Sequence, residues 1–343
     1  MRSGGTDVLL LGCVRMLSDR ERTIACWLLA LVIVAGFTVP GLSKAMSPFT
    51  QISLFLLIVM SLLPLGRMQV REVFSPDYKV WQVVAWQLLV LPALIVSAAH
   101  LARISSSITM LMVTTAAAGS LFASPTFAEL LQVNKARALQ CMVLSTFLMP
   151  FSYSFFFTVV LQANVNLDFL SLLQRCLIYL VIPLGILLIY MGTSLSLPTR
   201  LVEAVEGASR RSTLLALMVF GLGVVGPARE LLLDNPQRFA LYLVVVASLG
   251  VGMAYLTAVV MFRQGISDSV TAAIVSGFRN VGLGFVLLSG SANDATYQYV
   301  GVSQIPIFLA PLALSLFVRR QRVALEAYEA DLPEPAGLAR AAA

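Results

Sequence analysis

Apolar residues fill stretches of about 20 positions along nearly the whole chain, and short polar segments separate these stretches. A helix of that length crosses a bilayer, whereas the strands of a membrane barrel are about half as long. The pattern therefore predicts an all-α integral membrane protein with about ten transmembrane helices. The expected helices cover residues 24–42, 49–65, 80–99, 107–131, 138–161, 169–195, 212–225, 239–262, 268–288 and 297–317.

Two of these helices are interrupted in their middles, at matching places in the two halves of the chain. The fourth helix is broken at residues 118–120 and again at 123–126, and the ninth is broken at 276–282. Lipid cannot satisfy the peptide groups that a break releases, so a break persists only where protein or a watery cavity surrounds it. Paired breaks at equivalent positions of two halves indicate the binding site of a secondary transporter.

Each half contains five expected helices, so the halves enter the membrane in opposite directions and form an inverted repeat. We expect one group of helices to form a panel and the other, with the two crossing broken helices, to form a core. The expected segments are a cytoplasmic N-terminal segment 1–23, the repeats 24–163 and 164–320, and a cytoplasmic tail 321–343.

The composition agrees with membrane residence. Of the 343 residues, 59% are hydrophobic and only 12% are charged, whereas soluble domains carry about 25% charged residues. The net charge of +6 arises from basic residues that gather on one side of the expected helices, about 17 against 4 on the other. Because cytoplasmic loops hold the excess of Lys and Arg, we expect both termini in the cytoplasm. We expect the membrane to be the inner membrane of a bacterium. This distribution follows membrane topology, so no nucleic-acid partner is expected.

Arg279 is the strongest candidate for a functional residue. A charge near the bilayer centre costs about 2.5–3.5 kcal/mol, so such a side chain normally faces a cavity or a partner. Its planar guanidinium suits the carboxylate or sulfonate of an anionic substrate. The alternative from the sequence alone is a structural ion pair with Glu129 or Asp268.

Polar residues at the two breaks are the other candidates for substrate binding. Asn280 can donate and accept hydrogen bonds, so it suits either a substrate or the freed backbone groups. The hydroxyls of Ser120, Ser124 and Thr126 are expected to bind substrate, and alternatively they bond back to the preceding helical turn.

The remaining candidates shape the crossing point or could carry a proton. Gly119, Gly277 and Gly282 allow the crossing segments to approach closely, and Pro125 secures the first break because it lacks a backbone donor. Glu129 could carry a proton if it is buried, or it could lie at the cytoplasmic interface.

At both breaks the sequence resembles the bile acid:sodium symporter family. Residues 116–124 resemble that family's first crossover, and 133–139, together with Ser145-Thr146 and Pro150, resemble the stretches that follow it. Residues 277–283, Gly-Phe-Arg-Asn-Val-Gly-Leu, resemble its second crossover, Glu-x-Gly-x-Gln-Asn-x-Gly-Leu. The resemblance implies a ten-helix inverted-repeat fold that transports an organic anion, such as a sterol acid or keto acid, together with sodium.

The sequence departs from this family at the positions that the resemblance assigns to sodium. These positions are occupied by Pro125, Ala138, Met142, Val275 and Arg279. Sodium needs several oxygen ligands, and a nearby guanidinium repels it, so the departures argue against sodium coupling and against a bound metal. A further interpretation of Arg279 follows, in which it is a tethered cation that fills the space sodium takes in relatives.

The sequence thus predicts a secondary transporter that moves a small organic anion across the bilayer by alternating access. It holds no zinc-protease motif, Walker loop or other catalytic pair, so we expect no enzyme activity, and no protein partner is evident. One alternative is an efflux carrier of related fold, driven by protons or by the membrane potential. Another is a membrane receptor or scaffold that keeps a ligand pocket without transporting.

The charge distribution makes a prediction about topology. Alkaline phosphatase fused after Ala343 should be inactive, because the enzyme folds only outside the cytoplasm, whereas green fluorescent protein at the same site should fluoresce. Phosphatase activity in intact cells would contradict the expected cytoplasmic C-terminus.

Overall fold

The structure, a computed structural model, describes residues 19–63, 77–161, 174–175, 177–194, 197–288 and 294–330. Every regular element in these ranges is a helix, and the one extended pairing found there is an isolated bridge between Ser120 and Arg279. The prediction of an all-α chain is therefore confirmed for the part of the chain that the structure describes.

Five of the described helical segments are long and apolar enough to cross a membrane, so the chain is a membrane protein. The five segments are Pro40–Leu62, Tyr78–Leu101, Lys135–Val160, Thr199–Asp234 and Pro236–Val260. Shorter apolar helices occupy Cys26–Thr38, Ser106–Ala116 and Ile178–Ser194.

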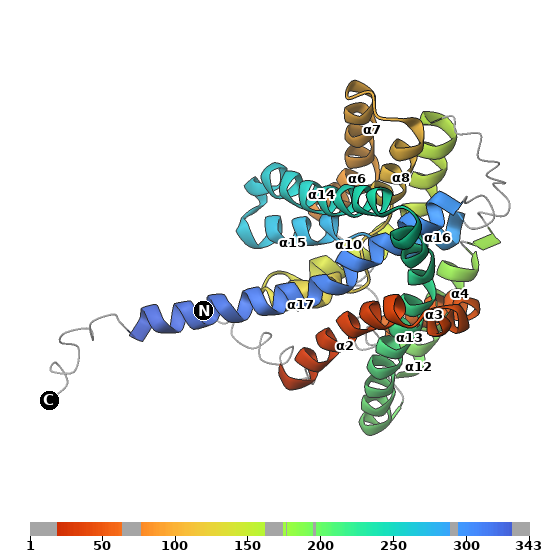
Figure 1. Cartoon of the computed structure of the whole chain (residues 1–343). Coiled ribbons are helices and arrows are strands. Elements are labelled where there is room, and N and C mark those ends of the chain that lie inside the picture. Colours follow the sequence, from red (N-terminus) through yellow and green to blue (C-terminus); the bar gives the residue numbers. More distant parts are fainter. Residues whose placement is uncertain are drawn as a thin grey trace, which may run out of the picture.

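Helices from the beginnings of the two expected repeats pack against one another. In this first group, α13 contacts α2, α3 and α4, and α12 contacts α4. Figure 1 shows them together on the lower side of the molecule. The elements are α2 (Asp19–Thr38), α3 (Pro40–Met46), η1 (Ser47–Phe49), α4 (Thr50–Leu62), η5 (Leu177–Val181), α12 (Ile182–Ser194) and α13 (Thr199–Asp234).

A second group holds the helices around the two breaks. Here α10 contacts α6, α9 and α15, while α14 contacts α8 and α15. The elements are α6 (Tyr78–Ala85), η3 (Trp86–Val90), α7 (Leu91–Leu101), α8 (Ser106–Ala116), α9 (Ser124–Leu130), α10 (Lys135–Ser154), η4 (Phe155–Val160), α14 (Pro236–Val260), η6 (Phe262–Gln264) and α15 (Ile266–Gly277).

The last two helices connect the groups. The helix α16 (Val281–Leu288) contacts α8 and α4, and α17 (Asp294–Ala330) contacts α13 as well as α14. Figure 1 shows α17 passing between the two groups and continuing beyond them. A large apolar cluster also joins the groups, since it contains Leu54 and Ile58 of α4 together with Met142 and Met149 of α10.

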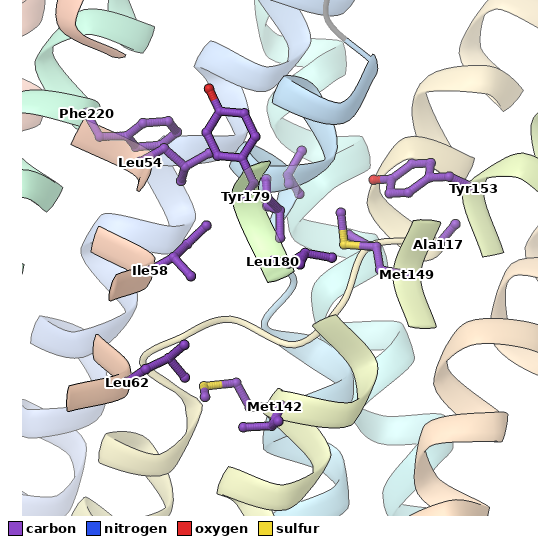
Figure 2. Packing of buried hydrophobic residues seen from close by; sticks show 14 of the residues in the cluster. Leu54, Ile58, Leu62, Ala117, Met142, Met149, Tyr153, Tyr179, Leu180 and Phe220 are labelled. Atoms are coloured by element: carbon purple, nitrogen blue, oxygen red, sulfur yellow. The ribbon is translucent and has the colours of Figure 1, made fainter. Parts of the chain in front are cut away.

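Figure 2 shows this cluster from close by, with Ile58 and Leu62 directed from α4 toward Met142 and Met149 on α10. These contacts are apolar on both sides, and hydrophobic contact is not directional. The two groups can therefore shift against each other without breaking a hydrogen-bonded register at these residues.

Charged residues join three helices of the second group at one end. The Nζ atom of Lys79 lies 3.0 Å from Oδ2 of Asp268, and Arg137 pairs with Asp268 through Nη1. Arg137 also reaches Asp77 at 3.1 Å, and the Asp77 side chain caps α6 by accepting from Val80 N. These pairs connect the starts of α6, α10 and α15. The expected alternative of an Arg279–Asp268 pair is wrong, because the Asp268 carboxylate is taken by these two cations.

Several expected limits need correction. The seventh helix, expected over 212–225, spans Thr199–Asp234, because its polar first turns contain good helix formers and Pro227 does not end it. The helix α17 continues through residues 321–330, which were expected to begin the tail, and α2 begins at Asp19 inside the expected N-terminal segment. The expected boundary between the repeats, at 163/164, lies outside the described residues.

Close packing of α13 against α3 and α4 depends on a glycine. A Cβ atom at Gly223 would lie 2.4 Å from Oγ1 of Thr50 and 3.0 Å from the carbonyl oxygen of Met46. Gly252, in the middle of α14, has no atom within 4 Å of the same position. Both residues lie in helices, so an added methyl group changes their helix propensity equally.

We expect Gly223→Ala to lower the thermal unfolding midpoint of the detergent-purified protein by several degrees, because overpacking costs about 1–3 kcal/mol. The control, Gly252→Ala, should leave the midpoint unchanged or raise it slightly. Equal midpoints for the two variants would contradict the packing described here.

Candidate functional site

The two breaks lie against each other and exchange backbone hydrogen bonds. Asn280 N donates to the carbonyl oxygen of Gly119 at 2.8 Å, and Leu121 N donates to that of Phe278 at 2.9 Å. These two bonds flank the bridge between Ser120 and Arg279. Segments far apart in the sequence thus satisfy each other's freed peptide groups, which is what a break needs at membrane depth.

Both breaks are shorter than the sequence pattern indicates. The first separates the end of α8 at Ala116 from the start of α9 at Ser124, so Pro125 stands in the first turn of α9 rather than in the break. Proline is favoured there because the first helical N–H groups have no intrahelical acceptor. The second break consists of residues 278–280, since α15 runs to Gly277 and α16 begins at Val281.

The helix α10 supplies the other partners of the first break. Ser145 Oγ accepts from Ser120 N at 3.0 Å and donates to Ser120 Oγ at 3.1 Å, and Gly119 N donates to the sulfur of Met149 at 3.0 Å. Ser120 Oγ in turn donates to Oε1 of Gln87 at 3.1 Å. All of the hydroxyl and amide groups in this network belong to residues that are fully buried.

The predicted glycines were expected to let the two crossing segments approach each other, but their close contacts are with other helices. A Cβ at Gly119 would lie 3.1 Å from the backbone of Ser145, and one at Gly277 would lie 2.9 Å from the carbonyl oxygen of Gly250. A Cβ at Gly282 would clash with the ring of Phe220 on α13, at 2.5 Å. The glycines therefore bring each crossing segment close to a neighbouring helix, rather than bringing the two segments close to each other.

Arg279 is the largest fully buried side chain in the described part of the chain, with 1% of its surface exposed. Nη1 donates to the carbonyl oxygen of Ala118 at 2.9 Å, and Nη2 donates to that of Gln87 at 3.3 Å. Among the described residues it forms no ion pair, and its Nε has no partner. Within the described part of the chain, the guanidinium is therefore held by main-chain oxygens and not by a carboxylate.

Asn280 combines a structural role with a spare donor. Its Oδ1 accepts from Leu283 N at 3.1 Å, which caps the start of α16, while its Nδ2 has no partner among the described residues. Two buried hydroxyls at the breaks, Ser124 and Ser276, also lack partners in the described part. Buried polar groups are normally paired, so unpaired ones at a break indicate a place for a ligand or water.

For three of the predicted site residues the structure gives no support for ligand binding. Ser120 is engaged with Ser145 and Gln87, so it has a structural role in this conformation. Thr126 and Glu129 lie on α9, but their side chains fall outside the described residues. The expected bonding of Glu129 with Arg279 and its role as a proton carrier therefore stay predictions.

Three of the positions that the family resemblance assigns to sodium lie in apolar clusters. Ala138 and Val275 are fully buried in one apolar cluster, and Met142 is buried in another. No group of three or more His, Cys, Asp or Glu residues in the described ranges could hold a metal ion.

A small cavity lies between α4 of the first group and α10 of the second, with η5 and α12 alongside. Its volume is about 20 Å³, enough for about one water molecule. The lining is apolar except for Thr146, whose buried Oγ1 has no partner among the described residues. The lining residues are Ile58, Leu62, Phe122, Met142, Val143, Thr146, Phe147, Leu180 and Leu184.

Sequence reasoning missed Gln87 and Met149 as members of this region. Gln87 offered a signal, because it and Gln82 are the two amides in the otherwise apolar stretch 80–99, and Pro92 follows it closely. Met149 gave none, since a methionine in an apolar helix is ordinary.

A scan against protein-family models finds no match for this chain, and a search of curated protein sequences finds none either. What the site can do therefore follows from its own residues.

The Ser120–Ser145 contact makes a prediction about stability. Ser145→Ala leaves the buried Ser120 N–H without an acceptor, so it should lower the free energy of unfolding by about 1–3 kcal/mol. The control is Ser154→Ala on the same helix, where the hydroxyl is half-buried, which should change it by less than about 0.5 kcal/mol. Denaturant titration of both variants in detergent measures the difference, and similar losses would contradict the role of Ser145.

Proposed function

We propose that this protein is a secondary transporter that carries a small organic anion across the membrane by alternating access. The observation that carries the proposal is the backbone pairing of two interrupted helices around a buried arginine. Broken helices at membrane depth are costly, and secondary transporters use them to place polar groups at a substrate site between two sets of helices.

The arrangement of helices supports two repeats. The first two helical units of each expected half lie in the first group. Of the two broken helices, each fourth in its half, α8, α9 and α15 lie together in the second group, and α16 connects the two groups. An inverted repeat related by a two-fold axis would produce this pairing of equivalent helices. The proposal includes ten spans and a distant relationship to the bile acid:sodium symporter family, with the two groups as panel and core.

The charge at the crossing point favours an anion. Arg279 contributes a positive charge, and Nδ2 of Asn280 and Nε of Arg279 are donors without partners among the described residues. The N-terminus of α16 adds the positive end of a helix dipole next to Asn280. A carboxylate accepts from such donors, so a keto acid, a sterol acid or another carboxylate fits this site.

The apolar cavity between α4 and α10 marks where the apolar part of the substrate would bind. At about 20 Å³ it is too small for any organic anion, so binding requires the two groups to separate there. The Thr146 hydroxyl would then be the polar group nearest to the apolar part of the substrate. The same separation exposes the crossing point, and its reversal on the other side completes alternating access.

A reversible cross-link across this cavity tests the proposal. In a variant with Cys13, Cys26, Cys141 and Cys176 replaced, Leu62→Cys with Val143→Cys places one thiol on each group at the cavity. We expect uptake of labelled cholate or pyruvate by proteoliposomes to fall at least about tenfold after linking with a bis-methanethiosulfonate, and to return on reduction.

The control is the single variant Leu62→Cys, which cannot be linked and should keep its uptake after the same treatment. A protein that binds one of these anions in detergent but gives no flux in liposomes, linked or unlinked, would contradict transport. That result would favour the receptor or scaffold alternative.

A further inference from the structure

We infer that the Arg279 side chain occupies a cation site at the crossing point, so that the protein carries its own cation and takes none from solution. The contacts of the guanidinium are the starting point. Two nitrogens donate to the carbonyl oxygens of Ala118 and Gln87, and Nη2 lies 3.9 Å from the sulfur of Met253. All are neutral groups that present partial negative charge.

The first carbonyl, that of Ala118, lies in the break just beyond the C-terminal end of α8. The helix α8 ends at Ala116, and Ala118 N turns back to Thr115 O at 3.3 Å, so the last carbonyls of α8 lose their usual donors. Tyr153 supplies its hydroxyl to Thr114 O, and Arg279 supplies Nη1 to Ala118 O. The C-terminal end of a helix carries partial negative charge, and such ends of broken helices bind Na⁺ in secondary transporters.

The second carbonyl is released by a local change in helix winding. At the π-helical turn η3, Leu91 N donates to Trp86 O instead of to Gln87 O. Pro92 cannot donate to Gln87 or Leu88, since it has no N–H. Leu88 O accepts from Ser152 Oγ at 2.6 Å, which leaves Gln87 O for Arg279. Such π-helical turns frequently occur at functional sites.

Neutral carbonyl oxygens that converge from interrupted backbone are the ligands that alkali cations use in membrane proteins. Here both oxygens are bonded to a charged group that is covalently attached to the second break. The described residues around it offer no carboxylate, and among them only main-chain dipoles and the Met253 sulfur balance the positive charge. The guanidinium thus has the surroundings of a bound cation and not those of a salt bridge.

Two consequences follow from a tethered cation. The native site has no vacancy for Na⁺ or K⁺, so neither ion should stabilise the protein or drive its transport. Removing the charge but keeping a polar side chain should leave carbonyls and an amide around a vacated space. An alkali cation can enter that space and satisfy them. The claims about cation binding and stability rest on the contacts of Arg279 alone, while the claim about transport rests on the proposed function.

Cation binding to purified protein is the decisive measurement. We expect the wild-type protein to unfold at the same temperature in equal concentrations of NaCl, KCl and choline chloride. Arg279→Gln should unfold at lower temperature in choline, and 0.2 M NaCl or KCl should raise its midpoint by at least about 5 °C. Arg279→Gln should also retain ²²Na⁺ in equilibrium dialysis at about one ion per chain, whereas the wild-type protein retains none.

Arg229→Gln is the matched control, because Arg229 Nε also donates to a main-chain oxygen, that of Phe37 at 2.9 Å, but its side chain is only half-buried. It should show no difference between sodium and choline. If Arg279→Gln fails to fold, ²²Na⁺ retention and the salt series on the wild-type protein still decide the question. Sodium-specific stabilisation of the wild-type protein, or an Arg279→Gln variant that folds and ignores sodium, would overturn the inference.

Uptake separates this inference from the proposed function. Wild-type proteoliposomes should take up cholate or pyruvate equally in sodium and choline buffers. Uptake that strictly requires sodium would overturn the tethered cation but keep the transporter. Sodium binding by Arg279→Gln, in a protein whose wild type gives no flux, would keep the cation site and overturn the transporter.

Discussion

The backbone of two interrupted helices imposes the constraint on which the rest of this structure depends. Each break releases peptide groups where neither water nor lipid satisfies them. The chain solves this by setting the breaks against each other, so that Asn280 N bonds to Gly119 O and Leu121 N to Phe278 O. Further groups at the first break bond to side chains: Gly119 N donates to Met149, Ser120 N donates to Ser145, and Ala118 O accepts from Arg279.

The position of Arg279 is a consequence of the same constraint. Arg279 is buried with no carboxylate partner among the described residues, which is normally costly, but interrupted helices provide unpaired carbonyls that need a donor. The guanidinium donates hydrogen bonds to the carbonyl oxygens of Ala118 and Gln87, which would otherwise lack donors, and these oxygens in turn stabilise its positive charge. The π-helical turn at η3 and the absence of an N–H at Pro92 belong to this arrangement, because they release the Gln87 carbonyl.

The polar crossing point lies beside an apolar interface, and the two differ in how strongly their contacts depend on direction. The hydrogen bonds at the crossing point require fixed geometry, whereas the contacts among Leu54, Ile58, Met142 and Met149 between the two helix groups tolerate sliding. Motion is therefore easier between the groups than within the second group. The ion pairs of Asp268 with Lys79 and Arg137 further hold the starts of α6, α10 and α15 together.

The sequence by itself determined the helical character, the membrane location and the existence of the two breaks, because hydrophobic length and the Gly, Pro and polar interruptions are local properties. It also identified Arg279, Asn280 and Ser120 as candidate residues of the site, and it named Asp268 as a charged residue that could form an ion pair. Only the tertiary structure decided their partners: Ala118 and Gln87 for the guanidinium, Ser145 for Ser120, and Lys79 with Arg137 for Asp268. These contacts join residues far apart in the chain, and helix periodicity carries no information about which distant residue fills an orphaned hydrogen bond.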